Sequence, residues 1–274
     1  INDLEDFAKD RVLSLGVIDG RNIWRADLSG VLDRLEPVVA KLGKDRVQIA
    51  PSCSLLHVPI ELALENGLDP EIKSWLAFSV QKIEELTALA TALAGGRGAA
   101  AGSLKASDVA AASRKASPRI HNAKVAARVA GIDDAMRRRA SVFADRASVQ
   151  HARFNLPAFP TTTIGSFPQT AEVRKARAAH ARGTLTDDAY RSYLQEQTAR
   201  AVNWQEDIGL DVLVHGEFER NDMVQYFGEQ LAGFGFTANG WVQSYGSRYV
   251  RPPVLFGDVS RPSPMTVEWW RYAQ

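Results

Sequence analysis

Cysteine is almost absent from this sequence, since Cys53 is the only one among 274 residues. A lone cysteine forms no disulfide within the chain, and it excludes a structural zinc site built from several cysteines. Together with the lack of a secretion signal at the front, this favours a reducing, cytoplasmic location. No HxxxH or HExxH spacing occurs among its histidines, at positions 57, 121, 151, 180 and 215, so the sequence carries no positive sign of a metal site. A site built from His and carboxylate side chains with Cys53 stays open at this point.

Charge of one sign and long apolar runs are lacking as well. The net charge of +1 at pH 7 provides no field that would attract nucleic acid or an anionic membrane. No apolar run approaches the roughly 20 residues that span a bilayer. A hydrophobic fraction of 45% and a charged fraction of 24% are typical of soluble globular proteins. We therefore expect neither a nucleic-acid partner nor a membrane.

Both ends of the sequence carry helical patterns that are cut short. The apolar spacing of residues 1–8 is already helical, and there is no initial Met. Residues 267–274 follow Thr266, a residue type that often precedes a helix, and they reach the end of the sequence without a C-cap. The pattern predicts a fragment of a longer polypeptide.

The first ninety residues alternate short apolar runs with helical patterns. Strands are predicted at 15–20 and 47–51, and helices at 24–42 and from Asp69 through Leu86, the second with Pro70 in its first turn. Such a β-α-β-α order predicts a parallel sheet covered by helices, and hence an α/β fold. We assign residues 1–90 to one domain.

The middle of the chain differs in composition, and a second α/β unit follows it. Residues 91–155 are rich in Ala and basic side chains, and we predict linking helices there that contribute no core. Residues 156–274 repeat the order strand, helices, strand, with helices predicted at about 170–182 and 186–208 and short β segments up to Asp258. Neither unit has enough strands to close a sheet, so the pattern favours two partial (β/α)8 barrels joined by a helical linker.

Polar residues follow the two strands predicted in the second unit, at 161–165 and 211–216. In an α/β barrel the C-terminal ends of the strands face the substrate. Gly165 would let a ligand approach the backbone, Ser166 could hold a carboxylate, and Glu217 could receive an ammonium group. These residues predict a clamp for an amino acid; the alternative is a tight turn with a solvated glutamate.

Other candidate residues have structural readings beside the functional ones. His215 is either a general base or a hydrogen-bonded structural residue, and Asn221 or Asp222 could cap the next helix. Cys53 and His57 suggest a nucleophile and a base, but Leu55 and Leu56 between them favour packing. Arg248 could hold a carboxylate or stack on a flat ring, or it could lie in a surface turn.

Several long motifs resemble one enzyme family. They are Thr161-Thr-Thr-Ile-Gly-Ser-Phe-Pro-Gln-Thr170, Asp211-Val-Leu-Val-His-Gly-Glu217, Glu219-Arg-Asn-Asp-Met223, Asn239-Gly-Trp-Val-Gln-Ser-Tyr-Gly-Ser-Arg248, Gly257-Asp-Val-Ser-Arg-Pro262, Gly20-Arg-Asn-Ile-Trp-Arg-Ala-Asp27 and Ser52-Cys-Ser-Leu-Leu-His57. The sequence is similar to cobalamin-independent methionine synthases, which are 5-methyltetrahydropteroyltriglutamate–homocysteine methyltransferases. The likeness is weakest at about 91–120.

This resemblance implies two facing (β/α)8 barrels, of which the chain would hold the end of the first and the start of the second. It implies that Ile164, Gly165, Ser166 and Glu217 bind homocysteine, and that Arg248 and Tyr249 contact the folate. Tyr249 departs from the cysteine of many relatives, so its contact is expected through the backbone. The family's zinc ligands, two Cys, a His and a Glu, match no residue here, and neither does its His proton donor.

Three readings of function follow. In the first, the chain is part of an enzyme that transfers a methyl group from 5-methyltetrahydropteroyltri-L-glutamate to L-homocysteine, and it holds no catalytic residue and is inactive alone. In the second, it is a non-catalytic module that binds an amino acid. In the third, it is a scaffold whose open barrel edges associate with another copy or another chain.

Overall fold

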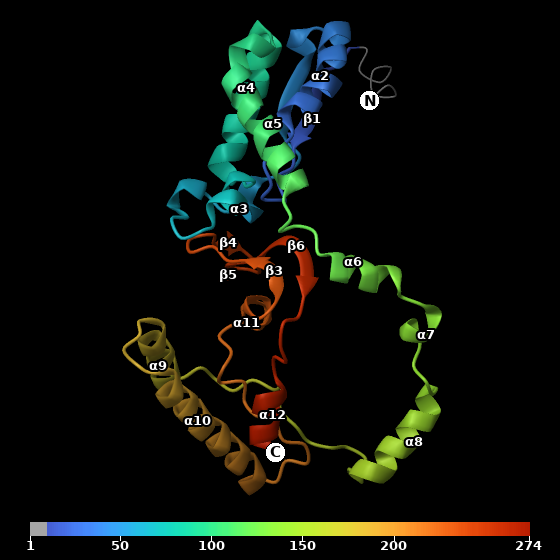
Figure 1. The fold of residues 1–274 in the computed structure, drawn as a ribbon, viewed down its shortest axis with the longest axis vertical. Helices are drawn as coiled ribbons and strands as arrows, with labels where there is room; N and C mark the ends of the chain where they lie inside the picture. Colours follow the sequence, from blue (N-terminus) through green and yellow to red (C-terminus); the bar gives the residue numbers. More distant parts are fainter. Residues whose placement is uncertain (1–9) are drawn as a thin grey trace. The chain divides into compact units, whose positions relative to one another are not determined.

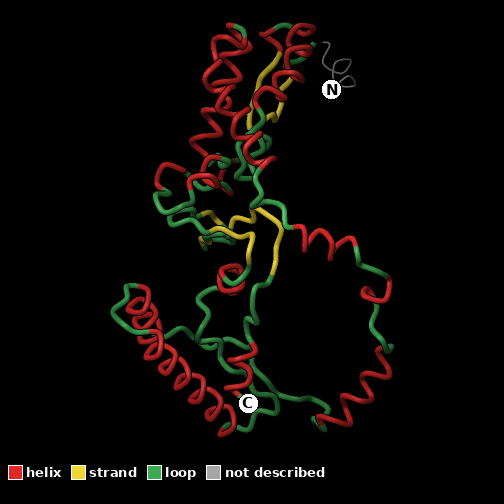
Figure 2. The backbone as a smooth tube through the Cα atoms, in the orientation of Figure 1, coloured by secondary structure: helices red, strands yellow, loops and turns green. Residues whose placement is uncertain are grey.

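The computed structural model describes residues 10–274 as an α/β chain with three small two-stranded sheets (Figures 1 and 2). Its contacts divide it into two compact units, one of residues up to 122 with 233–259, the other of 123–232 with 260–274. The helix expected at residues 1–8 lies outside the described residues. The α/β class is confirmed, and none of the sheets described is a closed barrel. No helix between residues 10 and 274 has both the length and the apolar character needed to cross a bilayer.

The first unit is built on two parallel strands. β1 (Leu13–Ile18) pairs with β2 (Val47–Pro51) from Leu13↔Val47 to Ile18↔Pro51, and α2 (Leu28–Leu42) connects them. Ile18 is fully buried, together with apolar residues of α2 and α4 (Ser79–Gly95). Burial of this shared apolar surface is the main force that joins strands and helices here. The β-α-β order expected from the sequence is confirmed.

The helix α2 starts four residues later than the sequence pattern suggested. Its N-cap is Asp27, whose carboxylate accepts a hydrogen bond from the Gly30 N–H at 3.0 Å. Trp24 instead pairs in an antiparallel bridge with Leu76, so its backbone is committed to a neighbouring segment. The prediction of a helix from residue 24 was therefore wrong in its first turn.

The single helix predicted from Asp69 through Leu86 is two helices. α3 (Pro70–Ser74) ends before Trp75, and α4 begins at Ser79. Between them, the Trp75 carbonyl accepts from Arg25 N–H and the Ala77 N–H donates to the Ile23 carbonyl, both at 2.8 Å. Trp75 and Phe78 are almost fully buried. Tertiary hydrogen bonds and burial of these two rings outweigh the helical pattern, and the continuous helix was wrong.

Residues 97–116 belong to the core of the first unit. α5 (Ala101–Ala116) follows a short 3₁₀ turn at Arg97–Ala100 and buries Leu104, Ser107 and Ala110. The Ser107 hydroxyl donates to the Ala26 carbonyl at 2.7 Å and accepts from the Leu28 N–H at 3.0 Å, which ties α5 to the start of α2. The expectation that residues 91–155 contribute no core was therefore wrong for α5, whose small residues allow close packing.

Four further strands, β3 to β6, complete the sheets of the structure. β3 (Ala232–Gly235) pairs with β6 (Val254–Ser260), and β4 (Val242–Gln243) pairs antiparallel with β5 (Tyr249–Val250). The fully buried Glu65 accepts hydrogen bonds from the N–H groups of Ala238 and Asn239, which fixes the loop between β3 and β4. Residues 233–259 thereby join the unit that contains residues up to 122. The short β segments expected up to Asp258 are confirmed.

Helices dominate the second unit. They are α6 (Ala123–Ala130), α7 (Asp134–Arg137), α8 (Phe143–Phe154), α9 (Ala171–Ala181), α10 (Asp187–Asp207), α11 (Met223–Glu229) and α12 (Val267–Ala273). The side chains of Thr170 and Thr186 cap α9 and α10, which lie side by side in Figure 1, and both helices are confirmed nearly at their expected bounds. No residue of α6, α7 or α8 is buried in the structure as described. α12 is confirmed, although the Thr266 side chain makes no capping hydrogen bond.

The two strands predicted in this unit are not regular strands. Residues 161–166 and 211–216 run parallel and meet at their ends, where Val212 N–H donates to Thr161 O and Ser166 bridges Gly216. Between these points the side-chain amide of Gln205, fully buried on α10, bonds both the N–H and the carbonyl of Val214. Because a side chain of α10 takes these backbone groups, the strand predictions were wrong while the side-by-side placement was right.

Candidate substrate site

Two glycine turns bring the candidate residues of the second unit together. Gly165 has φ +112° and Gly216 has φ +87°, in the region that favours glycine. Ser166 bridges Gly216, and the Phe167 N–H donates to the Gly216 carbonyl at 2.8 Å. A Cβ at position 216 would lie 2.6 Å from the Phe218 ring, so glycine is required there for space as well as for its φ. The chain therefore turns sharply just before Glu217.

Glu217 carries unusual backbone geometry. Its φ is +57°, and among the described residues only Asn155 shares a positive φ without being glycine. A residue with a side chain adopts this conformation at a cost of about 1–2 kcal/mol, and such outliers concentrate at functional sites. A Cβ added at Gly165 would lie 3.6 Å from Glu217 Oε1, so the absence of a side chain at Gly165 leaves the carboxylate accessible from that side.

A compact set of charges surrounds Glu217. Arg220 Nη1 lies 2.8 Å from Glu217 Oε1, and Arg220 Nε lies 3.0 Å from Glu219 Oε1. His215 Nε2 lies 3.0 Å from the same Glu219 oxygen. Burial of the Glu219 carboxylate would raise its pKa, but the hydrogen bond and charge of His215 and the charge of Arg220 lower that pKa below its ordinary 4.5. Glu219 is therefore held as an anion. His215 is a hydrogen-bonded partner of it, as the structural alternative predicted.

The turn that presents these side chains is fixed from two sides. Arg177 of α9 donates through Nη2 to the carbonyls of Phe218 at 2.8 Å and Arg220 at 3.1 Å. On the other side, Asp222 caps α11 by accepting from the Gln225 N–H at 2.9 Å, so of the two cap candidates Asp222 is the N-cap. A site held by helices on both sides keeps its side chains in a defined geometry.

Beside this turn lies a cavity of about 860 Å³ within the second unit. Glu217, His215 and Arg220 supply its charged wall, and Gly165 exposes backbone to it. Apolar surface comes from residues of three other elements, namely Val202, Phe227 and Trp270. Its volume is in the range of small-molecule pockets, and a few polar groups on an apolar lining are typical of them.

The other two residues of the predicted clamp do not line the cavity. Ile164 is 94% exposed, and Ser166 is also exposed at the bridge to Gly216. The structure therefore places Gly165 and Ser166 beside the segment that carries Glu217. Of the predicted clamp residues, only Gly165 and Glu217 border the cavity.

Arg248 and Tyr249 lie in the first unit, in the hairpin of β4 and β5. The Arg248 N–H donates to Tyr245 O at 3.0 Å, and the Arg248 carbonyl accepts from Ser244 N–H at 2.9 Å. Tyr249 pairs with Gln243, and both Arg248 and Tyr249 are exposed. The side chain of Arg248 forms no ion pair with any residue from 10 to 274. The surface-turn geometry leaves its guanidinium open to solvent.

No metal site is formed by the described residues. Within residues 10–274 there is no group of three or more His, Cys, Asp or Glu side chains that could hold an ion. Cys53 is a half-buried free thiol, and a Cβ at Gly20 would lie 3.1 Å from its sulfur. His57 Nδ1 instead lies 3.4 Å from the Gln243 carbonyl. No hydrogen bond joins Cys53 to His57 in the part of the chain that the structure describes, and Leu56 between them is 54% exposed, so neither the catalytic pair nor the packing interpretation is supported.

Comparison with known proteins identifies the family of the chain. Residues 159–274 match the model described as "Cobalamin-independent synthase, Catalytic domain", and residues 1–43 match its N-terminal domain. The chain belongs to the cobalamin-independent synthase family. The resemblance seen in its motifs is thereby confirmed. The match to the catalytic-domain model spans Gly165, Ser166, Glu217, Arg248 and Tyr249.

This cobalamin-independent synthase chain is similar to curated proteins that share a name. The chain is 72% identical to the 5-methyltetrahydropteroyltriglutamate–homocysteine methyltransferase of Nitrobacter winogradskyi, over 97% of the chain's own length. It is 69% identical to the enzyme of that name from Caulobacter vibrioides over 96%, and 58% identical to that from Acidithiobacillus ferrooxidans over 99%. In each case it spans 34% of the relative's length.

Sequence reasoning missed the role of Arg220 and Glu219 in this cobalamin-independent synthase chain. Both residues belong to the motif Glu219-Arg-Asn-Asp-Met223, but neither was predicted to be a site residue. The spacing of Glu217 to Arg220 and of His215 to Glu219, three and four residues, would have suggested ion pairs on a helix. These residues form a turn in which Gly216 and Glu217 have positive φ, and the paired side chains meet there.

Proposed function

We propose that the full-length protein transfers the methyl group of 5-methyltetrahydropteroyltri-L-glutamate to L-homocysteine, forming methionine. Membership of the cobalamin-independent synthase family and the shared name of the curated relatives support this. In the reaction, the homocysteine sulfur attacks the methyl carbon, an S–CH₃ bond forms and the N5–CH₃ bond breaks. The electron pair stays on N5, which takes up a proton, and the thiol proton of homocysteine is lost.

The observation that carries this proposal to individual residues is the placement of Glu217. Its carboxylate borders the cavity of the second unit beside Gly165, where an α-ammonium group can approach it. Ile164 and Ser166 continue the same segment, and we propose that the Ser166 N–H or hydroxyl binds the homocysteine carboxylate. An ammonium paired with a carboxylate in a partly enclosed cavity makes a charge-assisted hydrogen bond, which is stronger than a neutral one.

For the folate we propose Arg248 and Tyr249. The exposed guanidinium of Arg248 can pair with a carboxylate or stack on a flat heterocycle, because it makes no ion pair with the described residues. Tyr249 offers backbone groups on the open side of a two-stranded hairpin. Both substrates are the ones named in the curated relatives.

The barrels also belong to this proposal. Residues 1–90 would complete an N-terminal (β/α)8 barrel, residues 91–155 would link the two barrels, and residues 156–274 would begin the catalytic one. The parallel pair β1–β2 and the parallel course of 161–166 and 211–216 support such an arrangement. The full-length protein is further proposed to be cytoplasmic.

Zinc, which the family resemblance implies, does not fit the side chains described. Because residues 10–274 bring no three ligand-type side chains together, we assign no step of the reaction to a metal held by them. We propose that zinc binds the full-length protein through residues outside this chain, and that the isolated chain is inactive.

A second candidate function is that of a scaffold that associates with another copy or chain. Large apolar side chains of the linking helices are exposed, among them Phe143 at 76% and Val149 at 67%. Unpaired strand edges and exposed apolar surface favour association. A monodisperse monomer with one sharp thermal transition would contradict this candidate.

The enzyme proposal is tested by Glu217→Gln in the full-length protein, which preserves shape and removes the charge. We expect the homocysteine KM to rise about ten- to hundredfold, since one hydrogen bond to a charged group is lost, while the KM for the folate stays unchanged. Glu196→Gln, on the exposed face of α10, is the matched control. An unaltered homocysteine KM in Glu217→Gln would contradict the assignment.

A further inference from the structure

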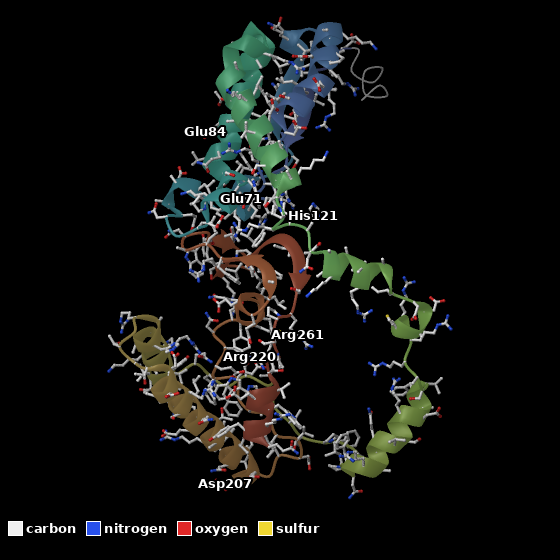
Figure 3. The ribbon with its side chains drawn as sticks, in the orientation of Figure 1. Glu71, Glu84, His121, Asp207, Arg220 and Arg261 are labelled. Carbon is white, nitrogen blue, oxygen red and sulfur yellow. The ribbon has the colours of Figure 1, made fainter. Side chains whose placement is uncertain are left out.

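Arg220, which is labelled in Figure 3, belongs to the turn that precedes α11. Its guanidinium lies between two carboxylates. Its Nη1 reaches Glu217 Oε1 at 2.8 Å and its Nε reaches Glu219 Oε1 at 3.0 Å. Its side chain is 13% exposed, so these bonds are largely shielded from water. The planar guanidinium presents its donors in a rigid fork, so the direction of one bond sets the direction of the other.

Arg220 is itself held firmly. Its guanidinium carbon lies 5.5 Å from the centre of the Tyr226 ring and 5.3 Å from that of Phe227, both on α11. The backbone N–H of Arg220 donates to the Glu217 carbonyl at 3.1 Å, and the carbonyl of Arg220 accepts a hydrogen bond from Arg177. The buried Glu219, paired with His215, fixes the second end of the guanidinium. Arg220, the partner of Glu217 in this set, is therefore not free to move with it.

The pairing leaves one oxygen of Glu217 available. Arg220 uses only Oε1, and Oε2 has no hydrogen-bond partner among residues 10–274. Oε2 is therefore the acceptor of Glu217 that a ligand ammonium group can reach from the cavity that this residue borders.

We propose that Arg220 is the positioning residue of the amine site, which it serves by orienting Glu217 so that Oε2 faces the ligand. This inference rests on the proposed function, in that the ligand is taken to be homocysteine. Glu219 bonds Arg220 rather than Glu217, so it acts on the amine through Arg220. Arg220 is the hydrogen-bond partner of the Glu217 carboxylate among residues 10–274, so without it the side chain would sample several rotamers, and ordering it on binding would weaken affinity.

The test is a double-mutant cycle in the full-length protein, with the homocysteine Kd measured by calorimetry. Arg220→Ala is expected to raise that Kd about tenfold in the wild-type background and to have almost no effect in the Glu217→Gln background, because Arg220 acts through Glu217. Arg220→Lys is expected to fall between, since it keeps the charge but not the fork. The folate KM should change by less than about twofold in all of these variants, and Arg200→Ala, exposed on α10, is the matched control.

Each other result is also decisive. An unchanged Kd in Arg220→Ala overturns the inference, and so does an equal rise in both backgrounds, which would mean a general structural role. If Arg220→Ala fails to unfold cooperatively, Arg220→Lys carries the same cycle. A wild-type protein that binds no homocysteine would contradict the proposed function itself, a result distinct from homocysteine binding that depends on Glu217 but not on Arg220.

Discussion

At the scale of single residues, the backbone of Glu217 combines a cost in stability with a candidate role in binding. The left-handed conformation is unfavourable for any residue with a Cβ, so a glutamate at this position lowers the stability of the folded protein relative to glycine. Its place between Gly216 and the paired Arg220 directs the side chain toward the cavity. A glycine at 217 would relieve the strain and would abolish the charge.

This strain can be measured with two substitutions that remove the same carboxylate. Glu217→Gly and Glu217→Ala both lose the bond to Arg220, so their difference reports mainly the backbone. We expect Glu217→Gly to be more stable than Glu217→Ala by about 1 kcal/mol, because only alanine carries a Cβ at φ +57°. Urea unfolding of the two variants gives the difference. If the alanine variant is as stable as the glycine variant, Glu217 is not strained.

The sequence predicted which candidate residues would be neighbours, but not the geometry in which they meet. Glu217 and Gly165 were selected because they follow two segments that were expected to be neighbours, and the structure brings them together. The sequence contains no sign that Glu217 has a positive φ, or that Arg220 rather than solvent would pair with it. The turn at Glu217 and its pairing with Arg220 are held by Gly216, by Arg177 of α9 and by the rings of α11. No local sequence pattern encodes contacts from separate elements.

At the scale of elements, α2 contains a proline in its interior. Pro37 is exposed in the third turn and has no N–H to donate to the Asp33 carbonyl. We expect Pro37→Ala to stabilise the protein by about 1–2 kcal/mol, since the regained helical hydrogen bond outweighs the greater freedom of the unfolded chain. The quantity to measure is the free energy of unfolding in urea.

Pro70 provides the matched control for this prediction. It stands at the first position of α3, where a missing N–H costs nothing and the fixed φ suits a helix. Pro70→Ala should therefore destabilise the protein by less than about 1 kcal/mol, which is the opposite sign. Equal effects of the two substitutions would show that the interior position of Pro37 carries no penalty.

Elements with local signals were predictable, and those decided by distant partners were not. α9 and α10 begin after threonine caps and were found nearly at their bounds. The break at Trp75–Phe78 arises because residues 23–25 bond that segment across a separation of about fifty positions. The lost strand character near Val214 likewise results from Gln205 on α10. Propensity yields to such tertiary contacts.

At the scale of the whole molecule, the order of segments along the chain differs from their grouping by contacts. Residues 233–259 follow the candidate amine site in the sequence, yet their contacts are with the unit of residues up to 122. Buried Glu65 and the bonds between Ile120, Asn122 and Asp258 make these contacts. The predicted boundary between the linking helices and the second α/β unit, at residue 156, was drawn from the sequence pattern. That pattern carries no information on long-range hydrogen bonds. That boundary remains a prediction for the full-length protein.

The last prediction concerns the 274-residue chain as a molecule. Supplied with zinc, L-homocysteine and 5-methyltetrahydropteroyltri-L-glutamate, it is expected to form no methionine, while the full-length protein forms it under the same conditions. The physical reason is that a neutral thiol is a weak nucleophile, and residues 10–274 bring together no metal-ligand set that would activate it. Product is measured by mass spectrometry, with bound zinc measured in parallel. Methionine formed by the chain, with zinc retained, would mean that it builds a metal site from its own residues, and the assignment of the ligands to other segments would then be wrong.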